Sequence, residues 1–222
     1  DDDDGVTLRK DLPLLIGANG FPILDDVTNQ RYLGSTLPKW MGSTLQTFRY
    51  KNFTLSLLLD VRQGQYKYNQ LSNFLAAFGE SKITENRNQT IVFDGVLADG
   101  SRNQKAVFLG QSTGPDGIDY GAGYYRNYYR GASDKFIENA SWLRLRSAGL
   151  SYTLPAGWLK PTHTISGATV SFTGNNLWLH TKYTGFDPET SSSAASSNGA
   201  DSFAGFTYPA TRSFLFSVNL QF

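Results

Sequence analysis

A cluster of tyrosine and arginine side chains is the part of this sequence whose residue types best suit recognition of a ligand. Tyrosine offers a flat apolar ring with a polar tip, and arginine offers a planar fork of N–H donors. Such a set could contact a sugar or a peptide, and packing within a loop is the simpler alternative. The six candidate contact residues are Tyr124, Tyr125, Arg126, Tyr128, Tyr129 and Arg130.

Nothing typical of catalysis or metal binding accompanies this cluster. His163 and His180 are the two histidines of the sequence, and neither has a partner at ligand spacing. Cysteine is absent, which excludes disulfides and thiolate metal sites. No Ser–His–Asp or paired-carboxylate arrangement stands out, and the glycines of 114–123 lack the strand–glycine–helix context of a phosphate loop. We therefore expect neither an enzyme nor a cofactor or metal site.

Asp60 and Arg62 are the charged residues most clearly placed by a pattern. They lie in a segment, 53–64, where apolar residues recur at every second position, so an extended strand would carry one apolar and one polar face. Asp60 and Arg62 fall on the polar face, where they would line a polar path or, more simply, join the strand to a neighbouring part of the protein through an ion pair. The apolar set is Phe53, Leu55, Leu57, Leu59 and Val61.

The last ten residues, 213–222, alternate even more strictly. Their polar positions are Ser217, Asn219 and Gln221, and an aromatic residue ends the chain. This pattern is typical of the closing strand of an outer-membrane β-barrel, with lipid outside and water inside. A soluble β-sandwich strand can show the same alternation but seldom at a chain end. The apolar positions are Phe214, Phe216, Val218, Leu220 and Phe222.

The sequence predicts an all-β architecture of about five antiparallel strands. A bulge is expected near Gly174, because the apolar parity shifts from Val170 and Phe172 to Leu177 and Leu179. Short and long connections alternate, as they do between the two rims of an outer-membrane barrel, so the long ones are expected outside the cell. Five strands cannot close, so they must pair with others. The predicted strands are 40–50, 53–64, 141–153, 168–180 and 212–222; the loops are 1–38, 65–140 and 181–211, with a helix over 68–78.

Composition is consistent with this prediction. Aromatic residues make up 14% of the chain, and the formal net charge of +1 gives no indication of nucleic acid binding. Trp40, Trp142 and Trp178 fall near predicted strand ends and are expected in an interfacial aromatic girdle. The chain opens with Asp1–Asp4, interpreted as a solvated loop, and not with a signal peptide. The barrel prediction therefore expects these residues to begin inside a longer gene product.

Several segments together resemble one family, the SusC-like (RagA-type) TonB-dependent outer-membrane transporters of Bacteroidetes. They occur in the order and spacing of that family and cover most of the chain from about residue 20 onward. Each segment alone is weakly specific, and their combination is highly specific. They are LGSTLPKWMG (33–42), YKNFTLS (50–56), LDVRQG (59–64), FIENASWLRL (136–145), LSYTLP (150–155), WL (158–159), GNNLW (174–178), YTGFDPE (183–189) and the terminal strand ending at Phe222.

This resemblance implies a barrel of about 22 strands, of which these residues are the C-terminal five. The plug domain and the TonB box would lie upstream, outside this chain. Asp60 and Arg62 would face the lumen, lining a translocation path or tying the wall to the plug, and the tyrosine–arginine cluster would contact substrate or a SusD-like surface lipoprotein. The complete protein would import a glycan or peptide across the outer membrane with energy delivered through TonB. A passive barrel or adhesin, and a soluble carbohydrate-binding β-sandwich, are the alternatives.

Overall fold

The structure is a computed structural model that describes residues 13–24, 32–190, 203–204 and 206–222. The chain divides into two compact units. Unit 1 comprises Asp1–Gly34 and Tyr68–Ile137, and unit 2 comprises Ser35–Lys67 and Glu138–Phe222. The acidic run Asp1–Asp4 lies outside the described residues.

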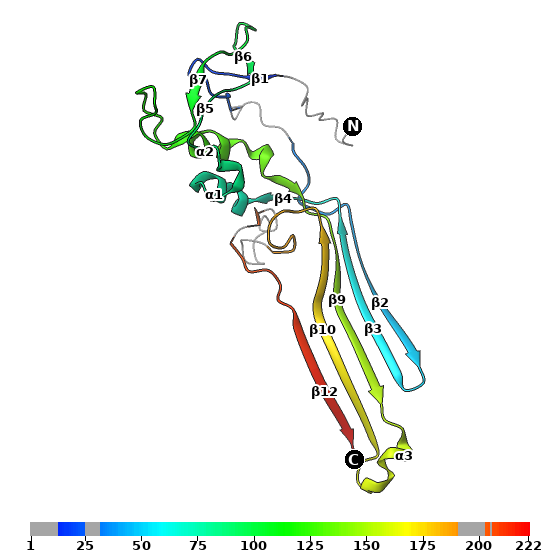
Figure 1. Cartoon of the computed structure of the whole chain (residues 1–222). Helices are drawn as coiled ribbons and strands as arrows, with labels where there is room; N and C mark the ends of the chain where they lie inside the picture. The colour runs from blue at the N-terminus through cyan, green and yellow to red at the C-terminus, as the bar shows by residue number, and fades with distance from the viewer. Residues whose placement is uncertain (1–12, 25–31, 191–202, 205) are drawn as a thin grey trace. The chain divides into compact units, whose positions relative to one another are not determined.

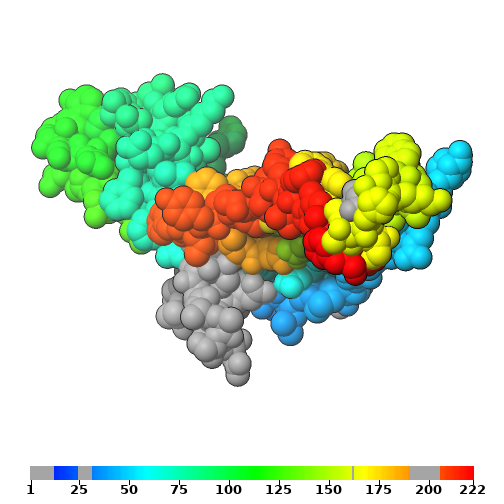
Figure 2. Space-filling model, turned by 90° about the horizontal axis from the view of Figure 1, so that it is seen from below, coloured from blue at the N-terminus to red at the C-terminus, as the bar shows by residue number. Residues whose placement is uncertain are grey.

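Unit 2 is built on a five-stranded antiparallel sheet in the order β12-β10-β9-β3-β2 (Figure 1). This confirms the predicted fold class, and each strand end lies within one residue of the range expected from the period-two pattern. In Figure 2 the end of β12, in red, lies beside the yellow connection that leads into β10. The strands are β2 (Trp40–Tyr50), β3 (Phe53–Gln63), β9 (Trp142–Thr153), β10 (Gly167–Thr181) and β12 (Ser213–Gln221).

One face of this sheet is mainly apolar, although the middle of β2 contributes Thr44 and Gln46 to it. The register places Leu55 opposite Leu150, and Phe172 opposite both Leu150 and Phe216, so the apolar positions of neighbouring strands meet. Phe172 and Phe214 stack with their ring centroids 5.8 Å apart. Other members of this face are Phe48, Tyr50, Phe53, Leu57, Leu59, Val61, Leu143, Leu145, Tyr152, Val170, Trp178 and Val218.

The opposite face is polar and has two regions. The half near the β2–β3 turn carries hydroxyl groups, with Ser171 and Ser217 bonded across strands at 2.6 Å. The half near the start of β9 carries the charged residues, where Asp60 of β3 pairs in register with Arg144 of β9. The polar face therefore carries mainly hydroxyl groups along one half, with Arg49 beside the β2–β3 turn, and a cluster of charged residues along the other.

A bulge in β10 confirms the irregularity expected near Gly174. The register with β9 shifts between Asn175 and Trp178, and Asn176 adopts a left-handed conformation with φ of 52°. Gly174 makes room for Leu177, because a Cβ there would lie 2.7 Å from Leu177 Cδ2. The prediction that Leu179 lies on the apolar face is wrong. The bulge brings Trp178 opposite Leu145 on the apolar face, so Leu179 lies opposite Arg144 on the polar face.

Unit 1 has a small aromatic core in place of an extended sheet. Phe21, Val107 and Leu109 are buried, and Tyr124 and Tyr128 pack against them with Ile91, Phe93 and Tyr120. Its helices are α1 (Gln70–Phe78), α2 (Gly123–Asn127) and the 3-10 helices Lys82–Thr84, Tyr129–Gly131 and Ser133–Lys135; its strands are β1 (Leu14–Leu15), β5 (Thr90–Val92), β6 (Gly95–Val96) and β7 (Ala106–Phe108).

The helix predicted over 68–78 begins two residues later than expected. Asn69 caps it, since its Oδ1 accepts a hydrogen bond from the backbone N–H of Ser72 at 3.0 Å. Gly79 ends it in a left-handed conformation with φ of 78°. The residues before the cap belong to β4 (Tyr66–Asn69), which forms a small sheet with β8 (Ile137–Asn139) and β11 (Phe203–Ala204).

A short helical connection joins β9 to β10. It consists of α3 (Ala156–Leu159) and the 3-10 helix Lys160–Thr162. Among the helices that the structure describes, none is long and apolar enough to cross a membrane.

Candidate functional site

The charged half of the polar face is the candidate functional site. Alternation along the strands brings Asp60 and Arg62 of β3 to the same face as Arg144 of β9. Arg146 joins them because β9 has one extra residue opposite β3, where the register shifts between Leu58 and Leu59. Arg146 Nε donates to Asp60 Oδ2 at 2.6 Å, so Asp60 forms an ion pair within the sheet itself.

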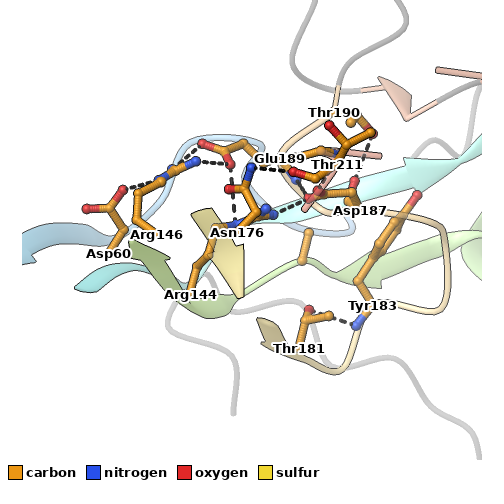
Figure 3. A network of polar contacts seen from close by, with 12 residues as sticks. Asp60, Arg144, Arg146, Asn176, Thr181, Tyr183, Asp187, Glu189, Thr190 and Thr211 are labelled. Carbon is orange, nitrogen blue, oxygen red and sulfur yellow. Dashed lines mark hydrogen bonds and ion pairs between the residues drawn. The ribbon is translucent and has the colours of Figure 1, made fainter. Parts of the chain in front are cut away.

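A segment after β10 folds against this face and completes the charge balance. We call residues 183–190 the strap. The buried guanidinium of Arg144 donates to Asp187 Oδ1 at 2.5 Å, and both side chains are only 3% exposed. Arg146 donates hydrogen bonds from both terminal nitrogens to the carboxylate of Glu189, at 2.9 and 2.6 Å (Figure 3). Two arginines of one strand therefore pair with two carboxylates of the strap, Arg144 through one hydrogen bond and Arg146 through two in fork-like geometry.

The two ends of the strap are fixed by further hydrogen bonds. Thr184 donates through its backbone N–H to Glu138 Oε2 at 2.7 Å and through its hydroxyl to Oε1 at 2.8 Å. Lys67 Nζ donates to the carbonyl oxygen of Thr190 at 3.2 Å. Tyr183 is buried beside Ala140, and this burial raises the pKa of its hydroxyl. The strap is thus held at both ends as well as in its middle.

The environment of Asp187 favours its ionised form. Burial alone would raise the pKa of this carboxyl, but the hydrogen bond from Arg144 and the backbone N–H groups of Glu189 and Ala210 hold it below its ordinary value of 3.8. A group whose pKa is lowered by folding contributes stability above its unfolded pKa, and this contribution disappears as the pH falls through the folded pKa.

We therefore expect the strap to stay packed against the polar face from pH 7 down to about pH 4. In stronger acid it should detach from that face. Hydrogen exchange of the peptide covering 183–190, corrected for intrinsic exchange rates, measures this in the full-length protein. An Asp187→Asn variant serves as control, since it has no carboxyl to protonate and should lack the acid transition. An identical transition in both proteins would contradict the assignment to Asp187.

The sequence predicted only part of this site. It placed Asp60 and Arg62 on the polar face, but it did not identify Arg144, Arg146, Asp187 or Glu189 as their companions. One signal was present, because arginines two residues apart in β9 fall on one face. The strap carboxylates gave no comparable signal, since each lies 43 residues from its arginine.

Trp142 is not a girdle residue as expected. Its side chain is 2% exposed on the charged face, and Arg62, Arg144 and Arg146 all lie over its ring at 5.4 to 5.6 Å. It shares the parity of Arg144 and Arg146, which the prediction from strand ends ignored. Trp40 and Trp178 lie on the apolar face near its end, where a girdle is expected.

Within the tyrosine–arginine cluster, most side chains are used in packing inside unit 1. Tyr125 donates its hydroxyl to the carbonyl of Ile83 at 2.6 Å, and Tyr129 meets Phe136 edge-on at 5.6 Å. Arg126 and Arg130 lie over the rings of Phe78 and Phe74, at 5.3 and 6.0 Å.

The other two tyrosines of the cluster belong to the aromatic core. Burial raises the pKa of Tyr124 to about 12, so this residue stays neutral. Tyr128 stacks on Phe21 with a centroid distance of 4.3 Å. The packing alternative therefore describes much of the cluster.

Comparison with known proteins gives one curated relative and a group of solved structures. No family model matches the chain. The chain is 29% identical over 209 residues to the TonB-dependent receptor SusC of Bacteroides thetaiotaomicron, an alignment that covers 94% of this chain and 17% of SusC. The chain thus spans about a sixth of the length of that relative.

Structures of the RagAB peptide importer are among the solved structures that the chain resembles. Chains in its "closed-closed" and "open-open" states match with TM-scores of 0.58 and 0.56 and sequence identities of 21% and 23%. Both matches cover 94% of this chain and 20% of the importer chain. A structure of the RagAB peptide transporter matches with a TM-score of 0.53 over 84% of this chain. The fold is therefore shared with part of these chains, and the predicted resemblance to SusC-like and RagA-type proteins is confirmed.

Proposed function

Because this chain resembles TonB-dependent receptors along nearly its whole length, we propose that it is a wall segment of a TonB-dependent transporter. The complete protein would import a nutrient, glycan or peptide, across the outer membrane. The observation that carries this proposal is an exposed apolar face running across five antiparallel strands, in a chain similar to SusC and to RagAB. The relatives are a receptor and importers, and we propose that this protein likewise has no enzymatic activity.

Strand length supports a membrane position for the sheet. β3 has eleven residues. At about 3.3 Å per residue and a tilt of about 40°, it rises about 28 Å, close to the apolar band of outer-membrane barrels. The edges at β2 and β12 would be paired with further strands of the same polypeptide, since an unpaired edge in lipid costs several kcal/mol per exposed backbone group. The charged face with Asp60 and Arg62 would then face the lumen.

The proposed partners follow from the same resemblance. The plug domain and the remaining strands belong to the rest of the polypeptide, through which TonB would act. A SusD-like surface lipoprotein would cover the extracellular side, where the connections 65–140 and 181–211 would lie. Exposed members of the tyrosine–arginine cluster, such as Arg126, are candidates for contact with that lipoprotein or with substrate.

The alternatives account for fewer observations. A soluble β-sandwich needs a second sheet over the apolar face, and the described residues of unit 2 supply none. A passive barrel or adhesin would share the strands but needs neither TonB nor a lipoprotein. Its fold would not by itself explain the similarity to SusC over 94% of the chain.

Extraction and co-purification test the proposal. We expect the polypeptide that carries these residues to require detergent for release from outer membranes and to co-purify with a surface lipoprotein. Intact mass would place residues 1–222 in a complex with, or within, a much larger chain. Release into plain buffer without detergent would contradict the membrane assignment, and a detergent-extracted barrel with no lipoprotein would favour the passive alternative.

A further inference from the structure

Unit 1 contains a pocket between the segment 17–24 and the end of α2. Its volume is about 460 Å³, within the range of small-molecule sites. Phe21 and Tyr128 form part of its wall, Leu24 and Ala18 lie at its sides, and Asn19 and Asn127 contribute amides. The two segments are far apart in sequence, so the pocket is a product of folding and has no local motif.

The aromatic wall of this pocket is fixed before any ligand arrives. Phe21 is 5% exposed and stacks on Tyr128 with an interplanar angle of 13°. Tyr124 lies nearly parallel to Phe21 at 6.0 Å and supports the same stack. Because these rings are already packed, binding a ligand against Tyr128 costs little conformational entropy of protein side chains.

Hydrogen bonds orient the polar groups at the edge of the ring. Asn19 accepts from the backbone N–H of Phe21 at 3.1 Å and donates through Nδ2 to the Tyr128 hydroxyl, also at 3.1 Å. The hydroxyl hydrogen of Tyr128 has no acceptor among the described residues. Asn127 donates to the carbonyl of Tyr120 at 3.3 Å, which leaves its Oδ1 as an acceptor. The pocket thus offers a ligand one donor and one acceptor beside an aromatic ring.

The pocket carries no charge of its own. Its nine lining residues are all uncharged. Lys105 reaches the backbone of the segment, where its Nζ donates to the carbonyl of Ala18 at 2.9 Å. A ligand with a carboxylate or an ammonium group would find no partner of opposite charge in the lining and would lose part of its hydration.

We propose that this pocket binds one ring of a neutral oligosaccharide. A sugar ring has an apolar C–H face for the wall of Tyr128, Pro22 and Leu24, and each of its hydroxyls both donates and accepts. That combination matches the Tyr128 hydroxyl and the Asn127 amide. An apolar peptide side chain would use the wall but has no donor or acceptor of its own for the two polar groups. This inference rests on the proposed function, because it names the substrate class of the proposed importer.

Binding to an array of neutral oligosaccharides, uronic-acid oligosaccharides and uncharged tripeptides tests the proposal. The protein is the full-length transporter purified in detergent with its lipoprotein, and calorimetry then measures the affinity for the best neutral oligosaccharide. Tyr128→Phe keeps the ring stack and removes the donor, and Asn127→Ala removes the acceptor. Each is expected to weaken binding about threefold to tenfold, the effect of losing one neutral hydrogen bond.

Two further variants separate pocket effects from folding effects. Ala18→Trp at an exposed turn should fill the pocket and abolish binding. Tyr120→Phe removes a hydroxyl from the same aromatic core, where it bonds Asp116 Oδ2 at 2.6 Å outside the lining, and should leave the affinity unchanged.

The outcomes distinguish the pocket from the proposed function. Selective loss of neutral glycan binding in Ala18→Trp and Tyr128→Phe supports the proposal. Unchanged binding in these variants, no neutral glycan bound by the wild type, or loss of tripeptide binding instead overturns it. Detergent extraction and lipoprotein co-purification are measured on the same preparations. The proposed function is therefore tested independently of ligand binding in the pocket.

Discussion

Replacing Asp187 with asparagine is expected to release the strap from the polar face of the sheet. The substitution leaves the buried guanidinium of Arg144 without its main counter-charge, since Glu189 approaches Arg144 Nε only to 3.5 Å. Removing one partner of a buried pair costs about 3–5 kcal/mol. Hydrogen exchange of the strap amides in the full-length protein should accelerate roughly 10²-fold to 4 × 10³-fold, since each 1.4 kcal/mol is about tenfold.

An exposed pair in unit 1 provides the matched control. Asp94 and Arg102 are 3.3 Å apart with side chains 88% and 79% exposed, so Asp94→Asn should leave exchange near it almost unchanged. A double variant, Arg144→Met with Asp187→Leu, should recover much of the lost protection because no charge remains buried. Equal protection in Asp187→Asn and wild type would show that the ion pair does not hold the strap.

Replacing Leu57 with arginine is expected to destabilise the membrane-inserted barrel. Leu57 lies in the middle of the apolar face, opposite Ala148 of β9 and Gln46 of β2. A charged side chain at the bilayer midplane on the lipid face costs about 2–4 kcal/mol. The urea midpoint of the full-length protein in lipid vesicles should fall accordingly.

The adjacent residue provides the control for this experiment. Ser56 lies on the polar face, opposite Gly149 of β9 and Thr47 of β2, and the proposed orientation exposes this face to water. Ser56→Arg should therefore lower the urea midpoint much less than Leu57→Arg. Equal tolerance at the two positions would contradict the proposed orientation of the sheet in the membrane.

The strands were predictable because their signal is local. Period-two alternation in 53–61 and 214–222 arises because one face of each strand meets apolar surroundings. The pattern can be detected in each segment alone, without information about its neighbouring strands. Alternation failed at β10, where left-handed Asn176 and the bulge change the parity of Leu179. Closeness to a strand end predicts a girdle position for Trp142, whereas the face it shares with Arg144 is the one on which it is buried.

The site was less predictable because its contacts are distant in sequence. Asp187 meets Arg144 across 43 positions, and Asn19 meets Tyr128 across 109. Irregular segments such as the strap have no period that would indicate which side chain turns inward. The resemblance to a family marked 183–189 as a motif, but only the folded structure assigns its carboxylates to arginines of β9.

The two ends of the strap also bear on how this chain can change during evolution. Lys67 and Glu138 are the last residue before the unit 1 portion 68–137 and the first residue after it, and both are bonded to the strap. The entry and exit of that portion are therefore both fixed by hydrogen bonds to the strap, within unit 2. Insertions succeed where the two ends of the inserted chain lie close together on a stable scaffold. Residues 68–137 can accordingly diverge or lengthen, together with the segment 13–24 that packs against them, while the strands of unit 2 keep their register.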